Sequence, residues 1–174
     1  MPAASYWKAL IWSRLSGSKA DRSLCRNVSR HRPVRIVEFG VGDLSRAMKV
    51  ISLAQRTAKE VAYCGIDLFD AREEEPGLKL KDAHHQLALT GAKVRLVPGE
   101  LPMAVARTAN VLTETDLLIV DAQHDDDALS AISGFLPRMV HPRTFVARYH
   151  GDPSQPKLHW PDPESFWARQ RRAA

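Results

Sequence analysis

Short apolar runs alternate with longer stretches of helical periodicity from Arg35 onward, and this alternation constrains the fold more than any other sequence feature. Continuous apolar runs are typical of strands buried on both faces, whereas apolar residues that recur every third or fourth position indicate helices that bury one face. Repeated strand–helix units predict a parallel sheet covered by helices. The runs span residues 35–39, 61–67, 93–97, 116–121 and 144–149, so we expect about five strands.

The stretches between the strands have the apolar spacing of helices. One runs from about Ser45 to Lys59, and another is centred on Ala83 and Leu87 and closes before the third strand. A third helix follows the fourth strand and begins at the acidic residues 125–127, whose charge suits the positive end of a helix dipole. The prediction is a single doubly wound, Rossmann-like α/β domain with a mostly parallel sheet over residues 34–150.

The two ends of the chain differ from this middle part. Residues 1–37 carry eight Lys and Arg against one Asp, whereas residues 38–150 carry thirteen basic and sixteen acidic side chains. We expect residues 1–33 to form a basic arm with a short amphipathic helix near residues 6–15. Such an arm either binds a polyanion or remains a solvated extension, and both readings stay open. Residues 151–174 contain four prolines and are expected to form an irregular tail, with a last helical turn near its end.

Composition also restricts location and partners. Two cysteines, Cys25 and Cys64, cannot by themselves build a disulfide framework or a zinc site, so a reducing cytoplasm is expected. The apolar runs are far shorter than the ~20 residues of a membrane-spanning helix, and the N-terminus has no usable signal peptide. We therefore predict a cytoplasmic protein without a transmembrane segment, and we leave homo-oligomerisation open.

The most specific local signal is a glycine loop between the first strand and the first helix. Gly40 and Gly42 allow a tight turn and a close approach to a ligand, and the helix N-terminus behind them offers free N–H groups. As a dinucleotide fingerprint the loop is incomplete, because Ser45 stands where a third glycine or alanine belongs. Glu38 is poorly placed beside a pyrophosphate but suits a cationic ammonium group, as in a sulfonium nucleoside with an amino-acid tail.

A second acidic residue, Asp67, ends the second strand, where Rossmann-like sheets place a ribose-binding carboxylate. The alternative is that Asp67 is only a turn or helix-cap residue.

Four segments together resemble the successive motifs of class I S-adenosylmethionine-dependent methyltransferases. They are Glu38-Phe-Gly-Val-Gly42, Gly65-Ile-Asp67, Val97-Pro-Gly-Glu100 and Leu118-Ile-Val-Asp121-Ala-Gln-His124. The similarity covers residues 34–149 and is greatest to the small O-methyltransferase-like branch. It implies S-adenosyl-L-methionine as the cofactor and methyl transfer to a small-molecule acceptor, with O-methylation favoured.

The resemblance also implies residue roles. Glu38, Gly40 and Gly42 would hold the methionine part of the cofactor, and Asp67 would hold the ribose hydroxyls. Gly99 and Glu100 would lie by the adenine, and Asp121 would face the transferred methyl group.

His124 is the candidate general base, because histidine titrates near neutrality and this one lies three residues after Asp121. A purely structural role, ordering the loop before the next helix, is the alternative. Metal-dependent relatives complete a magnesium site after the fifth strand, but here that strand ends at Arg148, Tyr149 and His150, with Asp152 as the nearest carboxylate. We therefore expect no metal site.

Two further functions remain as alternatives. The family continues after the fifth strand with a helix and an antiparallel hairpin, which residues 151–174 are expected to lack. A non-catalytic Rossmann-like nucleotide-binding or interaction protein derived from a methyltransferase would tolerate that loss. Nucleic acid is a possible partner of the basic arm but is not favoured, because no Asn/Asp-Pro-Pro-aromatic sequence follows the fourth strand. Trp160 and Trp167 could stack a ring substrate, although such tryptophans more often pin a tail to the core.

Overall fold

The protein folds around one six-stranded sheet with the strand order β3-β2-β1-β4-β5-β6. The computed structural model describes residues 18–71, 78–152, 156–162 and 166. The strands are β1 (Arg35–Phe39), β2 (Ala62–Asp67), β3 (Lys93–Pro98), β4 (Thr115–Val120), β5 (Val140–His150) and β6 (Lys157–His159). Neighbours among β1 to β5 pair in parallel, and β6 pairs antiparallel to β5. The predicted mostly parallel, doubly wound α/β sheet is confirmed.

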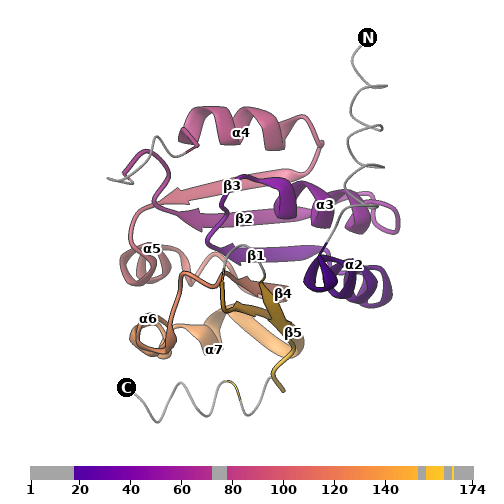
Figure 1. Cartoon of the computed structure of the whole chain (residues 1–174). Helices are drawn as coiled ribbons and strands as arrows, with labels where there is room; N and C mark the ends of the chain where they lie inside the picture. The colour runs from indigo at the N-terminus through magenta and orange to yellow at the C-terminus, as the bar shows by residue number, and fades with distance from the viewer. Residues whose placement is uncertain (1–17, 72–77, 153–155, 163–165, 167–174) are drawn as a thin grey trace.

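Helices cover both faces of the sheet (Figure 1). One face is packed by α2 (Lys19–His31), α3 (Ser45–Ala54) and α4 (Leu80–Ala88). The other is packed by α5 (Leu101–Thr108), α6 (Asp126–Ala131) and α7 (Leu136–Met139). A short 3-10 turn, η1 (Phe69–Ala71), follows β2. Alternate residues of each central strand enter opposite clusters, so Ile36 faces α2 to α4 whereas Val37 faces α5 to α7. Burial on both faces explains why the central strands are continuous apolar runs.

The sixth strand corrects the expectation of about five strands and an irregular tail. Leu158 lies opposite Tyr149 in the antiparallel pair between β6 and β5. Pro156 and Pro161 flank β6 instead of interrupting it, and a proline outside the paired residues removes no ladder hydrogen bond. The Trp160 side chain donates from Nε1 to Ser23 Oγ at 3.1 Å, so it anchors the tail to α2. The position of Trp167 is outside the described residues.

Part of the segment expected as a basic arm belongs to the core. Helix α2 begins after Ser18, whose hydroxyl accepts a hydrogen bond from Asp21 N at 3.0 Å. Ala20, Leu24 and Val28 recur every fourth position and are buried against the sheet and α3. This N-cap and spacing could have been recognised in the sequence. The amphipathic helix expected near residues 6–15 lies outside the described residues.

Helix α5 was also not anticipated. It follows β3 after the turn at Gly99, has a proline in its first turn, and buries Leu101, Ala104 and Val105. Helix α3 ends at Ala54, five residues before the predicted end at Lys59. No helix in the described part of the chain is both long and apolar enough to cross a membrane.

Candidate functional site

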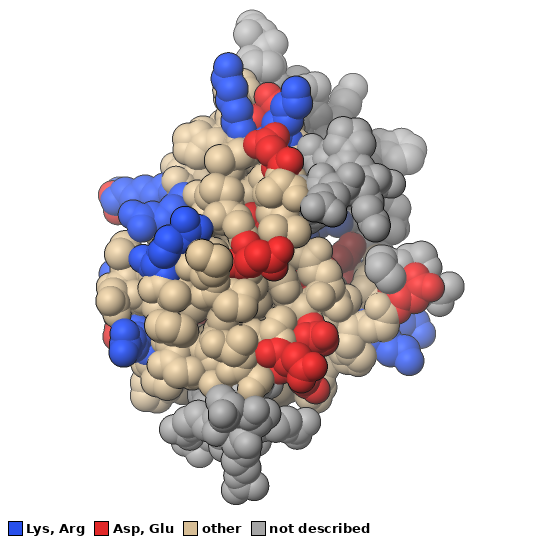
Figure 2. Space-filling view, turned by 90° about the vertical axis from the view of Figure 1, so that its left-hand side faces the viewer, with Lys and Arg blue, Asp and Glu red and all other residues tan. Residues whose placement is uncertain are grey.

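The predicted site residues gather at the carboxyl edge of the sheet. Strand β1 pairs with β2 on one side and β4 on the other, and Phe39 lies opposite both Ile66 and Val120. The residues that follow these three strands therefore share one edge. Figure 2 views the molecule from the side of this edge, where acidic side chains lie near the middle and lower part of the face.

The glycine loop after β1 approaches the end of β4 closely. Gly40 is buried with φ +82°, and a Cβ there would lie 2.6 Å from Asp121 Cβ and from Gln123 Nε2. Only glycine fits this position, both by space and by backbone conformation. Gly42, with φ +62°, is exposed and its Cβ position is open.

Asp67 fastens this loop to the end of β2. Its Oδ2 accepts hydrogen bonds from Val41 N at 2.7 Å and Gly42 N at 3.1 Å, and its Oδ1 accepts one from Leu68 N at 2.7 Å. Asp67 therefore has the turn role considered as the alternative. Ribose hydroxyls would have to share the carboxylate with these backbone donors or replace them. Ribose binding by Asp67 stays a prediction.

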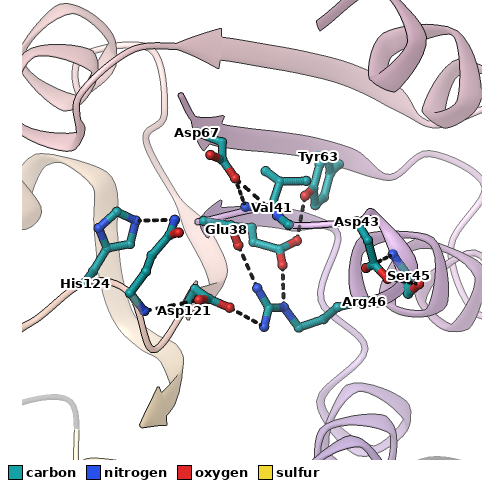
Figure 3. Close-up of polar contacts among 12 residues, drawn as sticks. Glu38, Val41, Asp43, Ser45, Arg46, Tyr63, Asp67, Asp121 and His124 are labelled. Carbon is teal, nitrogen blue, oxygen red and sulfur yellow. Dashed lines mark hydrogen bonds and ion pairs between the residues drawn. The ribbon is translucent and has the colours of Figure 1, made fainter. Parts of the chain in front are cut away.

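A partly buried ion cluster connects β1, α3 and the loop after β4 (Figure 3). Arg46 donates from Nε to Glu38 Oε1 at 2.5 Å and from one terminal nitrogen to Gly40 O at 2.6 Å. The other terminal nitrogen lies 2.8 Å from Asp121 Oδ2. Glu38 has no exposed surface, and its Oε2 accepts a hydrogen bond from Tyr63 Oη at 2.6 Å. The Tyr149 ring centre lies 4.6 Å from the Arg46 guanidinium carbon, a cation–π contact.

The electrostatics of this cluster keep Arg46 charged. Burial raises the pKa of Glu38, and the Arg46 guanidinium and the Tyr63 hydroxyl counteract part of that effect. Burial alone would lower the pKa of Arg46, but the carboxylates of Glu38 and Asp121 raise it above its usual value. Burial and the neighbouring Glu38 raise the pKa of Tyr63, so its hydroxyl stays protonated and donates.

Arg46 was missed by the sequence reasoning. The available signal was a basic residue in the first turn of the helix after the glycine loop. Nothing in the sequence showed that this side chain turns back onto β1.

His124 lies in the loop between β4 and α6. Its backbone N donates to Asp121 O at 3.1 Å, and its ring Nε2 is 3.3 Å from Gln123 Nε2. Burial lowers the pKa of His124, and the carboxylates of Asp121, Asp67, Asp125 and Glu100 counteract part of this effect. The imidazole is therefore neutral near pH 7 and can accept a proton. Its neighbour Asp125 caps α6, accepting from Ala128 N at 2.9 Å, so the loop-ordering role also remains open.

Gly99 and Glu100 adjoin the same edge. Gly99 has φ +124° and donates from its N to Asp67 O at 3.0 Å, and Glu100 is the exposed N-cap residue of α5. All the predicted site residues thus come together, and their individual roles stay predictions. The described residues include no group of three His, Cys, Asp or Glu side chains that could hold a metal ion. At the end of β5, Arg148 instead pairs with Asp126 at 2.7 Å.

Comparison with known proteins gives structural but no sequence relatives. No protein-family model matches the chain, and no curated protein is significantly similar in sequence. The O-methyltransferase TomG from Streptomyces achromogenes, solved in complex with SAM, superimposes with a TM-score of 0.58 and 13% identity over 88% of this chain and 65% of that one. A SAH-bound methyltransferase from Podospora anserina gives a TM-score of 0.53 with 15% identity, covering 81% of this chain and 59% of that one.

A TehB-like SAM-dependent methyltransferase from Corynebacterium glutamicum also has a TM-score of 0.53, with 15% identity over 99% of this chain and 84% of that one. The chain spans 36% to 66% of the length of TomG and three further methyltransferase structures. The chain therefore has the fold of class I SAM-dependent methyltransferases.

Proposed function

We propose that this chain binds S-adenosyl-L-methionine at the carboxyl edge of its sheet and transfers the methyl group to a small-molecule acceptor, with oxygen favoured as the methylated atom. The observation that carries the proposal is the convergence of the glycine loop, Asp67 and Asp121 at one edge of a sheet with a methyltransferase fold. Structural relatives that were solved with bound SAM or SAH suggest the ligand class.

The loop geometry favours this nucleoside over a dinucleotide. A pyrophosphate needs free backbone N–H groups at the glycine loop. Here Val41 N and Gly42 N both donate to Asp67, and the buried Glu38 lies two residues before Gly40. A negatively charged ligand would have to displace these hydrogen bonds and approach a carboxylate. A sulfonium nucleoside asks instead for carboxylates at its ribose and at its ammonium group, which this edge offers.

We expect the residues of this chain to contribute in two ways, by positioning the acceptor and by accepting its proton. The bound cofactor supplies an electrophilic methyl group, and methyl transfer by in-line displacement depends mainly on how the acceptor is oriented. Asp121 lies at the mouth of the sheet, where it would contact the acceptor. His124, neutral near pH 7, would take the proton that a hydroxyl acceptor loses when its oxygen forms the new bond to carbon.

The proposal is tested by binding and turnover measurements on the purified chain. We expect calorimetry to show binding of S-adenosylhomocysteine and a rise in melting temperature, because a ligand that prefers the native state stabilises it. NADH should bind far more weakly. Methyl transfer is then assayed with isotopically labelled cofactor against a panel of phenols, carboxylic acids and amines. Absence of binding at millimolar ligand by the folded protein would reject the proposal, and binding without turnover would favour a non-catalytic nucleotide-binding protein.

A further inference from the structure

Arg46 occupies a cup of three oxygen atoms that lies where the amino-acid end of the cofactor is expected. We define the ammonium cup as Glu38 Oε1, Gly40 O and Asp121 Oδ2. We infer that Arg46 is a built-in competitor for this cup, so that the cofactor's ammonium group must displace the guanidinium in order to bind. The inference rests on the proposed function and makes Arg46 the residue that sets selectivity for the amino-acid end of the cofactor.

Each of the three nitrogen atoms of the Arg46 guanidinium contacts one oxygen of the cup. Nε donates to Glu38, and the two terminal nitrogens contact Gly40 O and Asp121, all within 2.8 Å. An ammonium group also has three N–H donors and no acceptor. The three oxygens of the cup can therefore accept hydrogen bonds from either cation, and here they accept them from the guanidinium (Figure 3).

Arg46 contacts all three oxygens of the cup, so a second cation would have to share the same acceptors. Glu38 is fully buried, and its remaining oxygen is taken by Tyr63. Gly40 is in close contact with the end of β4, since a single added carbon there would lie 2.6 Å from Asp121 and Gln123. Two like charges at the same three oxygens would also repel each other strongly in this partly desolvated place. Binding of an ammonium group and retention of Arg46 in the cup are therefore mutually exclusive.

The exchange is physically accessible to Arg46. Its side chain is 16% exposed, whereas that of Glu38 is not exposed at all, so the arginine can leave toward solvent while the glutamate cannot. Asp121 is 29% exposed on its side chain and forms the open side of the cup. In the exchange one cation replaces another, so the ammonium group adds little net affinity in the natural protein. Without Arg46, the ammonium would relieve an uncompensated buried carboxylate and add much more.

The experiment compares two ligands on three proteins by calorimetry. The ligands are S-adenosylhomocysteine and its des-amino analogue, which lacks only the ammonium group. The proteins are the natural chain, Arg46→Met and the matched control Lys49→Met. Lys49 lies on the same helix but pairs with Asp21 on α2, away from the cup.

We expect the natural chain and Lys49→Met to bind the two ligands within about threefold of each other. Arg46→Met should bind S-adenosylhomocysteine at least tenfold more tightly than the natural chain does, with little change for the des-amino analogue. Arg46→Gln, which keeps a hydrogen-bond donor but no charge, serves if Arg46→Met does not fold. Should both fail to fold, the natural chain still decides, because a preference of more than about threefold for the amino ligand would overturn the inference.

Other outcomes are equally distinct. Weaker binding of S-adenosylhomocysteine by Arg46→Met, with the analogue weakened equally, would overturn the inference, because Arg46 would then hold the ligand's carboxylate. Equal affinities of natural and variant protein for the amino ligand would also overturn it while leaving the proposed function standing. Failure of both ligands to bind any of the proteins would instead remove the proposed function, and the inference with it.

Discussion

The hydroxyl of Tyr63 on β2 donates a hydrogen bond to Glu38 Oε2 on β1 at 2.6 Å, although Tyr63 is only 1% exposed and Glu38 is fully buried. An acidic side chain inside a parallel sheet is costly unless it is paired and hydrogen-bonded. Here one oxygen has a counter-ion and the other has a hydroxyl donor. The Arg46 ion pair and the Tyr63 hydrogen bond therefore stabilise a buried negative charge close to the glycine loop.

Tyr63→Phe should destabilise the protein by about 1.5 to 3 kcal/mol, because it leaves an oxygen of a buried carboxylate unsatisfied. Urea unfolding followed by far-UV circular dichroism measures the change. Tyr149→Phe is the matched control, since the Tyr149 hydroxyl is buried without a hydrogen-bond partner among the described residues. It should be neutral or slightly stabilising, and equal losses in the two variants would show that the Tyr63 hydroxyl has no special role.

Asp67→Ala should weaken binding of S-adenosylhomocysteine by tenfold or more, because charged hydrogen bonds contribute about 1.5 to 3 kcal/mol each. It should also lower the free energy of unfolding, since Asp67 accepts from three backbone N–H groups of the loop and turn. Calorimetry and urea unfolding separate the two effects. Asp70→Ala, which removes a carboxylate bonded to Leu80 N, is the control for affinity. A dissociation constant unchanged in Asp67→Ala would mean that Asp67 is a turn residue only.

At position 44 we expect a glycine variant to be more stable than an alanine variant, which is the reverse of the usual order. The φ of Leu44 is +68°, in the left-handed region, yet its side chain is almost fully buried. Leu44→Ala loses most of the packing and keeps the backbone strain. Leu44→Gly also loses the Cβ and makes the unfolded chain more flexible, but it relieves strain of roughly 1 to 2 kcal/mol, which we expect to be the larger effect. We expect both variants to be less stable than the natural protein, with the glycine variant the more stable of the two in urea unfolding. An alanine variant as stable as the glycine variant would contradict this account.

The pH dependence of methyl transfer should follow His124. Burial holds the pKa of His124 below its usual value of about 6.5, and the neutral imidazole is the form that accepts a proton. The rate should therefore be constant above about pH 6.5 and fall as the pH drops through the lowered pKa. Rate profiles with a hydroxyl acceptor test this, with His124→Gln expected to lower kcat by about a hundredfold or more.

His85, on α4, provides the control, and His85→Gln should leave the profile unchanged. A His124→Gln enzyme with the natural pH profile would show that this histidine only orders the loop.

Local pattern alone located most of the sheet. The runs 35–39 and 93–97 were placed to within one residue of β1 and β3: β1 is a central strand with a continuous buried run, and the edge strand β3 alternates exposed and partly buried residues. The glycine loop could also be recognised in the sequence, because glycine is the residue that most easily adopts the φ values of +82° and +62° found at positions 40 and 42. Helix α2 could also have been predicted from its N-cap, Ser18, and from its apolar spacing, but the basic charge of the segment favoured the interpretation as an arm.

Strand β6 could not be located in the same way. A strand of three residues is too short to show an apolar periodicity, and the nearby prolines are typical of loops. Lys157–His159 is a strand because it pairs with β5. Its formation is a consequence of tertiary contacts, not of local preference.

Local pattern places three acidic residues, Glu38, Asp67 and Asp121, near the carboxyl edge of the sheet. Each is one of the last two residues of a strand or directly follows a strand, and parallel strands end together. The contacts of Glu38 depend on how the helices pack on the sheet. The α3 helix returns across β1 so that Arg46, eight residues along the chain, meets Glu38 and Asp121 together. A contact of this kind depends on side-chain direction and helix packing, which have no signature in spacing, because a charged residue in a first helical turn is equally compatible with solvent.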